Sequence, residues 1–87
     1  MSESSALTFP CVFPIKVFGR SDAGLETALY AIATGFDTKF NPTSIKIQKS
    51  KQGNYVSVTL NIHAESLGQL DDLYKVISAH EAVIMAL

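Results

Sequence analysis

The chain has 87 residues, of which 47% are hydrophobic, and a formal net charge of −1. This length has room for one hydrophobic core, and the apolar content excludes an intrinsically disordered protein. No apolar run approaches the roughly 20 residues that span a bilayer, and the first residues lack the basic and apolar regions of a signal peptide. We therefore expect a cytoplasmic protein with a flexible tail over residues 1–7 and a single domain over residues 8–87.

The first predicted strand covers residues 13–19, where side chains alternate between two faces. Phe13, Ile15 and Val17 fall on one face, and Lys16 and Phe18 fall on the other. The first face is apolar throughout, so we expect it to lie against a core.

A helix is predicted after a turn at residues 19–22. Ser21 or Asp22 is expected to cap its first turn by accepting hydrogen bonds from free backbone amides. Apolar residues then recur at the spacing of one helical face, at Leu25, Leu29, Ile32 and Phe36. The helix is expected to end near Gly35.

The next two strands are predicted to form a hairpin around a tight connection at residues 51–54. The strand before it covers residues 43–50, with Ile45 and Ile47 facing inward. The strand after it continues to residue 64. Its apolar face consists of Val56, Val58, Leu60, Ile62 and Ala64. Its other face is half polar and consists of Tyr55, Ser57, Thr59, Asn61 and His63.

A second helix and a last strand complete the chain. Ser66 and Gln69 have the spacing of a capping box, in which each side chain satisfies a free amide at the helix start. The apolar stripe of this helix is predicted to be Leu67, Leu70, Tyr74 and Ile77. The last strand is predicted over residues 83–87, with Val83, Met85 and Leu87 on one face.

The predicted order is β-α-β-β-α-β, which is the ferredoxin-like plan of the α+β class. Two right-handed crossovers of this kind give a four-stranded antiparallel sheet in the order 4-1-3-2, with both helices on one face. The first and third strands are then central. The uncovered face is expected to carry Phe18, Tyr55, Ser57 and Thr59.

Three motifs in this order resemble the small YbeD-like proteins of bacteria. The opening has Phe9-Pro10, Phe13, Lys16-Val17 and Gly19, the hairpin has Ser50 with Gly53-Asn54-Tyr55 and Ser57-Val58, and the close has Val83, Met85 and Leu87. The similarity runs from about residue 7 to residue 87. It implies a ferredoxin-like fold close to that of ACT regulatory domains. It implies no activity, because the function of the family is unknown.

The turn at residues 21–25 also resembles the strand-to-helix turn of ACT domains, which commonly reads Asp-x-Pro-Gly-x-Leu. That resemblance implies an amino-acid ligand approached by the backbone at Gly24, and a helix start suits a carboxylate because its amides are free. The candidate ligand residues are Arg20, Ser21, Asp22 and Gly24. The proline is absent and Leu25 follows Gly24 directly, so an ordinary capped helix start is the favoured interpretation.

Four lysines lie in a stretch that contains no acid, between Asp37 and Glu65. A solvated lysine-rich edge that discourages aggregation is the favoured interpretation, and a patch for an acidic partner or a phosphate is the alternative. RNA-recognition domains share this fold and stack bases on aromatic residues of the central strands. Their third-strand motif has three aromatic residues where this chain has only Tyr55, so aromatic rings that cover a dimer contact or lie exposed are the favoured interpretation. The candidate partner or nucleic-acid face is Phe18, Lys46, Lys49, Lys51, Tyr55, Ser57 and Thr59.

Catalytic and metal-binding signals are weak. His63 is expected on the open sheet face and His80 in the turn before the last strand, and neither has the spacing of a metal ligand. Cys11 has no base beside it and forms no internal disulfide, which fits a reducing cytoplasm. The neighbours Asp71 and Asp72 point in different directions on a helix, so they make no acid–base pair.

The sequence therefore predicts a non-enzymatic regulatory or binding domain with no cofactor and no metal. We expect a homodimer that presents its open sheet face, or the loop at residues 20–24, to a small carboxylate ligand or a protein partner. A nucleic-acid-binding module that uses the basic hairpin is the alternative.

Overall fold

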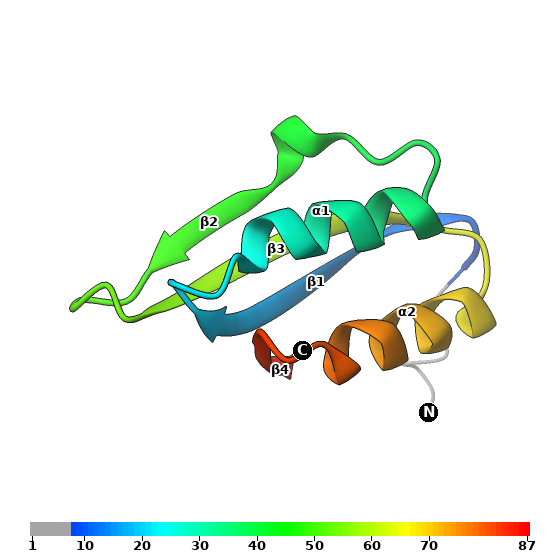
Figure 1. Cartoon of the computed structure of the whole chain (residues 1–87). Helices are drawn as coiled ribbons and strands as arrows, with labels where there is room; N and C mark the ends of the chain where they lie inside the picture. Colours follow the sequence, from blue (N-terminus) through cyan, green and yellow to red (C-terminus); the bar gives the residue numbers. More distant parts are fainter. Residues whose placement is uncertain (1–7) are drawn as a thin grey trace, which may run out of the picture.

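The computed structural model describes residues 8–87, so the tail expected over residues 1–7 lies outside the described residues. The elements are β1 (Cys11–Arg20), α1 (Leu25–Phe36), the 3₁₀ turn η2 (Pro42–Ser44), β2 (Lys46–Lys49), β3 (Tyr55–Ala64), α2 (Leu67–Ala79) and β4 (Val83–Ala86). The strands form one antiparallel sheet in the order β2-β3-β1-β4, with both helices on the same side (Figure 1). The ferredoxin-like plan and the predicted strand order are confirmed.

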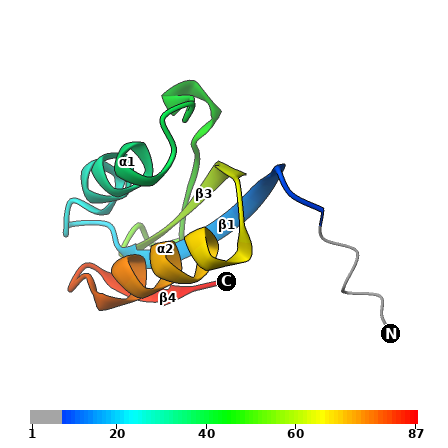
Figure 2. The same ribbon diagram turned by 90° about the vertical axis from the view of Figure 1, so that its right-hand side faces the viewer.

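The core lies between the helices and the two central strands. β1 and β3 pair over their whole length, from Cys11 opposite Ala64 to Arg20 opposite Tyr55. α1 packs against β3 and α2, and α2 lies beside β4 (Figure 2). The largest fully buried side chains are Ile15, Val17, Leu29, Val58, Leu60, Ile62, Leu73 and Ile77. Alternate residues of β3 are buried, as the sequence predicts, because successive side chains point to opposite faces.

The second strand is shorter than predicted. Residues 42–44 form a 3₁₀ turn, and β2 begins only at Lys46. The Asn41 side chain accepts hydrogen bonds from the amide of Thr43 at 3.0 Å and from its hydroxyl at 2.7 Å. Such local side-chain bonds compete with strand pairing, which is why the strand cannot start at residue 43. Ile47 lies on the helix-side face opposite Val58, but 42% of its surface remains exposed.

Gln69 has a different role from the one predicted at the start of α2. The Ser66 hydroxyl accepts a hydrogen bond from the Gln69 amide at 3.1 Å, as expected of a cap. The Gln69 side chain accepts from the amide of Glu65, one residue before the cap, and donates to the carbonyl of Phe36 at 2.8 Å. It therefore ties the start of α2 to the end of α1. Leu67 was predicted in the buried stripe, but it is 58% exposed and Leu73 is buried instead.

A bulge between β1 and β4 corrects the predicted face of the last strand. Phe18 is opposite Met85, whereas Gly19 is opposite Val83, so Ile84 is an extra residue on β4. Met85 therefore lies on the open face with Phe18. Val83 packs toward the core instead, and it does not share the face of Met85 as the alternation predicted.

Candidate functional site

The loop between β1 and α1 is held by its own side chains. Arg20 donates hydrogen bonds from Nε and Nη2 to the two carboxylate oxygens of Asp22, at 3.3 and 3.4 Å. The hydrogen bond and the charge of Arg20 hold the pKa of the Asp22 carboxyl below its ordinary value, and the same pairing raises the pKa of Arg20. The guanidinium predicted to contact a ligand is therefore already paired with an acid of its own loop.

Ser21 ties this loop to the connection between β2 and β3. Its hydroxyl donates to the carbonyl of Gly53, and its amide donates to the carbonyl of Asn54 at 3.0 Å. Gly53 has φ 78°, a left-handed conformation that suits glycine. Ser21 was predicted as a possible cap of α1, but its hydroxyl bonds the neighbouring turn instead.

The start of α1 has no side-chain cap. The residue at the cap position is Gly24, with φ 69° and ψ 30°, and no side chain accepts from the first amides. This corrects the predicted capping role of Ser21 or Asp22. Since the first amides of a helix have no partner inside the helix, they remain free to bind an acceptor.

These amides open onto a cavity between α1 and β2, which we call the α1–β2 groove. Its volume is about 260 Å³, and its lining includes Gly24, Leu25, Glu26, Ile47, Lys49 and Val58. The lining combines the apolar residues Leu25, Ile47 and Val58 with the charged residues Glu26 and Lys49. Of the predicted ligand residues, Gly24 and Ser21 line this groove. Arg20 and Asp22 line a separate hollow beside Asn54 and Tyr55.

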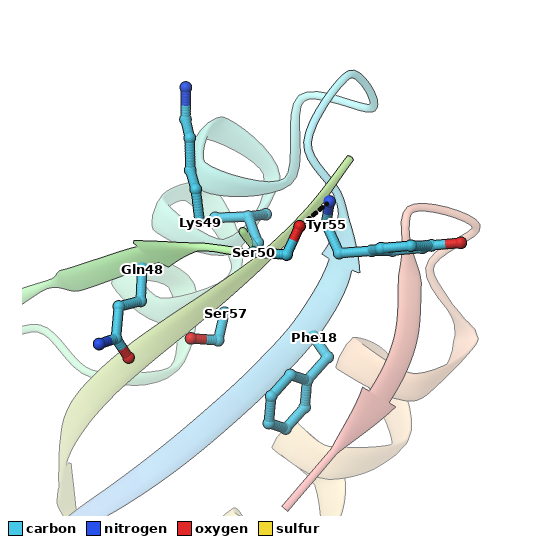
Figure 3. A pocket seen from close by; sticks show the side chains of 7 residues that line it. Phe18, Gln48, Lys49, Ser50, Tyr55 and Ser57 are labelled. Carbon is cyan, nitrogen blue, oxygen red and sulfur yellow. Dashed lines mark hydrogen bonds between the residues drawn. The ribbon is translucent and has the colours of Figure 1, made fainter. Parts of the chain in front are cut away.

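The uncovered face of the sheet carries the predicted aromatic residues. Phe18, Gln48, Tyr55 and Ser57 line a hollow of about 190 Å³ (Figure 3). Tyr55 is 52% exposed, and its amide donates to the Ser50 hydroxyl at 3.1 Å. Both aromatic side chains therefore lie where a second molecule can reach them.

The lysines predicted to share this face are divided by the structure. Lys46 is opposite Thr59, so it lies on the open face. Lys49 is opposite the buried residue Val56, so it belongs to the helix side, and Figure 3 shows it pointing away from Phe18. Lys51 lies in the turn that follows β2. By register, Lys46 alone of the three predicted lysines lies on the open face, although Lys49 also contributes to the lining of the hollow beside Phe18.

A hydrogen-bonded pair that the sequence did not indicate joins Asp37 to His63. Asp37 follows α1 and is 4% exposed. Its Oδ2 accepts from the backbone amide of His63 at 2.8 Å and lies 2.9 Å from Nδ1 of that ring, while Oδ1 accepts from the amide of Lys39 at 2.9 Å. Burial by itself would raise the pKa of Asp37, but these hydrogen bonds and the nearby imidazole outweigh it, so the pKa lies below its ordinary value.

The carboxylate of Asp37 supplies a hydrogen-bond acceptor at an unpaired edge of β3. β2 pairs with β3 only between Val56 and Thr59, so the later edge of β3 has no neighbouring strand there. Asp37 accepts the His63 amide on this free edge. His63 belongs to the half-exposed set of alternate β3 residues, on the face where it was predicted, and its bond to Asp37 is a contact that the prediction did not include. The partners are 26 positions apart, and no local pattern in the sequence marks such a pair.

The remaining candidate groups do not form a reactive cluster. His80 follows α2, and its Nδ1 accepts from the amide of Ala82 at 3.1 Å, which places it in the predicted turn. Cys11 is half-buried at the start of β1. Within residues 8–87, no group of three or more His, Cys, Asp or Glu is arranged to hold a metal ion. No helix in this range is long and apolar enough to cross a bilayer.

Comparison with known sequences identifies one family. The family model described as "Protein of unknown function (DUF493)" matches residues 4–87. The UPF0250 protein NE1487 of Nitrosomonas europaea is 37% identical over 87 residues, covering the whole of both chains. A UPF0250 protein of Leptothrix cholodnii is 41% identical over 85 residues, covering 98% of this chain and 93% of the relative.

Comparison with solved structures identifies the same fold in two proteins. The ACT domain from GTP pyrophosphokinase of Chlorobium tepidum superposes with a TM-score of 0.69 at 16% identity, covering 88% of this chain and 97% of that one. Protein HP0495 from H. pylori superposes with a TM-score of 0.70 at 16% identity, covering 100% and 96%. At this identity the likeness concerns the fold alone, and it agrees with the ACT-like architecture that the sequence indicated.

Proposed function

This chain belongs to the DUF493 family of proteins of unknown function, and we propose that it is a cytoplasmic, non-enzymatic regulatory domain that binds a small carboxylate at the start of α1. The observation that carries the proposal is the α1–β2 groove, where free helix amides adjoin apolar residues. The fold shared with an ACT domain is compatible with such a role, but the proposal rests on the groove itself.

The lining of the groove favours an amino acid among small carboxylates. The free amides of α1 and the ammonium group of Lys49 attract a carboxylate, because the helix start carries a partial positive charge. Glu26 lies in the first turn of α1 and also lines the groove. Its carboxylate repels a simple anion but pairs with an α-ammonium group. An apolar side chain of the ligand would then lie on Ile47, which is 42% exposed.

A titration of the protein with apolar amino acids and the matching organic acids, followed by NMR, tests this proposal. We expect saturable shifts at the amides of Leu25 and Val58, and tighter binding of the amino acid than of the organic acid. Lys49→Ala should weaken binding by about three- to tenfold, the effect of one partly solvated charge. Lys51→Ala, which removes the same charge from the turn, should leave it unchanged. Absence of saturable shifts for both ligand classes would refute the proposal.

Nucleic-acid binding through the hairpin is the alternative function, and the structure gives it less support. By register Lys49 belongs to the face opposite Phe18, and Lys51 lies in the turn, so only Lys46 of the three predicted lysines shares the open face with the aromatic residues. A gel-shift assay at low salt distinguishes the two, since binding to phosphate backbones strengthens as salt is lowered.

We also propose that two copies associate through the β4 edge. This edge exposes Ile84, Met85 and Leu87, at 61%, 48% and 62% of their surfaces, and β4 contains no charged residue. The opposite edge, β2, begins and ends with lysine, and lysine on an edge strand discourages pairing. A second copy therefore meets no like charge along the β4 strip.

Sedimentation of the protein at micromolar concentration is expected to give about twice the mass of one chain. Ile84→Lys should shift the protein toward monomers, because it places a charge in the contact. Ile47→Lys is the matched control, because it adds the same charge to the exposed β2 edge, and it should leave the mass unchanged. A monomeric wild-type protein, or equal effects of both variants, would contradict this arrangement.

A further inference from the structure

Two lysines and a threonine form one row across the open face of the sheet. Thr59 on β3 is opposite Lys16 on β1 and also opposite Lys46 on β2. Adjacent strands lie about 4.8 Å apart, so the backbones that carry the two lysines are about 9.5 Å apart. Both side chains are exposed, and their flexible stems allow the two ammonium groups to converge over the threonine hydroxyl.

No acidic side chain on the sheet neutralises these two charges, because none of the four strands contains an aspartate or a glutamate. Within the described part of the chain, the acidic side chains that pair are Asp22, with Arg20, and Asp37, with His63, and neither contacts Lys16 or Lys46. Two like charges at this separation repel each other at low ionic strength. An anion placed between them is therefore attracted to both ammonium groups and also reduces their repulsion.

The next row toward the hairpin supplies an aromatic ring and more hydrogen-bond donors. Ser57 is opposite Phe18 on β1 and opposite Gln48 on β2. Figure 3 shows these three side chains on the same side of the sheet. Gln48 and Ser57 line both the hollow beside Phe18 and a larger one, of about 510 Å³, beside Lys16 and Lys46. The cationic row and the aromatic ring therefore border one continuous surface.

We propose that this surface is a binding site for a small phosphate-bearing ligand that also carries a flat ring. The phosphate lies between Lys16 and Lys46 and accepts a hydrogen bond from Thr59, since ammonium and hydroxyl groups are suitable donors to phosphate. The flat ring of the ligand packs against the half-buried aromatic side chain of Phe18. The α1–β2 groove lies on the other face of the sheet, and the two sites meet along the β2 edge, where Ile47, Lys49 and Val56 contribute to both.

Titration with pyrophosphate and with ADP, followed by NMR at about 20 mM salt, tests the site under weak screening. We expect saturable shifts at Thr59 and Ser57 with both probes, and tighter binding of ADP because only ADP has a ring. Lys16→Gln and Lys46→Gln should each weaken both ligands about fivefold, the effect of one solvated charge. Phe18→Leu should weaken ADP and leave pyrophosphate unchanged.

Lys51→Gln is the matched control, because Lys51 lies in the turn that follows β2 and lines neither of the two hollows. It should change the affinity for ADP by less than about twofold, whereas the carboxylate in the groove should lose affinity when Lys49 is replaced. The substitutions therefore test the two proposed sites independently, so one proposal can be refuted while the other stands. Absence of saturable shifts up to about 10 mM, or equal effects of Lys46→Gln and Lys51→Gln, would overturn the site. If a single-stranded octanucleotide binds more than about tenfold tighter than ADP, the proposal of a small ligand is wrong and the site binds a nucleic-acid strand.

Discussion

Replacing Gly19 with alanine is expected to destabilise the protein by about 2–3 kcal/mol, the range for a side chain forced into a well-packed site. A Cβ atom at this position would lie 2.3 Å from the carbonyl oxygen of Ala82 and 2.8 Å from Cδ2 of Leu25. The leucine side chain can move, but the carbonyl belongs to the backbone that leads into β4. The added methyl group must therefore push β4 away from β1.

Gly35→Ala is the matched control for this substitution. Gly35 lies inside α1, and a Cβ atom there meets nothing within 4 Å. Alanine is a better helix former than glycine, so this variant should be stabilised by about 0.5–1 kcal/mol. Urea unfolding followed by circular dichroism measures both variants. A Gly19→Ala protein as stable as wild type would show that the backbone around Ala82 yields without cost.

Gly19 also shows which kind of contact cannot be predicted from the sequence alone. The alternation of residues 13–17 predicted the first strand, because a strand with one buried face imposes a period of two. Gly19 was predicted as the last residue of that strand and the first of the turn, and β1 continues one residue further, to Arg20. The close approach of Ala82, 63 positions later, is what no local pattern indicates.

The same distinction applies to the helices and the open face. Ser66 was predicted correctly as a cap, because its partner is only three residues away. Leu67 was misplaced, because helical spacing gives a stripe but not the width that neighbouring elements cover. The open face was predicted from Ser57 and Thr59. The contribution of Lys16 to its cationic row became visible only when the register placed it opposite Thr59.

The candidate groove depends on contacts that a sequence does not display. Gly24 was identified as a helix-start residue from its resemblance to ACT turns, and the structure places it at the cap position. Lys49 was grouped with the open face because three lysines lie close together in the chain. Strand alternation sends Lys46 and Lys49 to opposite faces, since they are three residues apart. The two proposed sites follow from that division.

Replacing Asp37 with alanine is expected to destabilise the protein by about 2–4 kcal/mol, the cost of leaving several part-buried donors without an acceptor. The lost acceptor serves the amide of His63, its ring and the amide of Lys39. Asp37→Asn preserves the shape of the side chain. However, its NH2 group replaces one carboxylate oxygen, so one of the donors from His63 or Lys39 faces another donor instead of an acceptor. We expect it to be destabilised as well, by a smaller amount.

The contribution of Asp37 should depend on pH in a defined direction. Its pKa in the folded protein lies below the ordinary value of 3.8, so the folded state prefers the ionised carboxylate. The resulting stability is fully present above the unfolded pKa and is lost as the pH falls through the folded pKa. The difference between wild type and Asp37→Asn should therefore be largest near neutral pH and shrink in acid, below about pH 4.

Urea unfolding at pH 7 and at pH 3 measures this change. Asp72→Asn is the control, because it removes an equal charge from an exposed position on α2, and its stability should stay within about 0.5 kcal/mol of wild type at pH 7. A constant difference between wild type and Asp37→Asn at both pH values would mean that the shape of the side chain matters and its charge does not. In that case the edge of β3 would be held by hydrogen bonding alone, and the ionised state of Asp37 would add nothing to the fold.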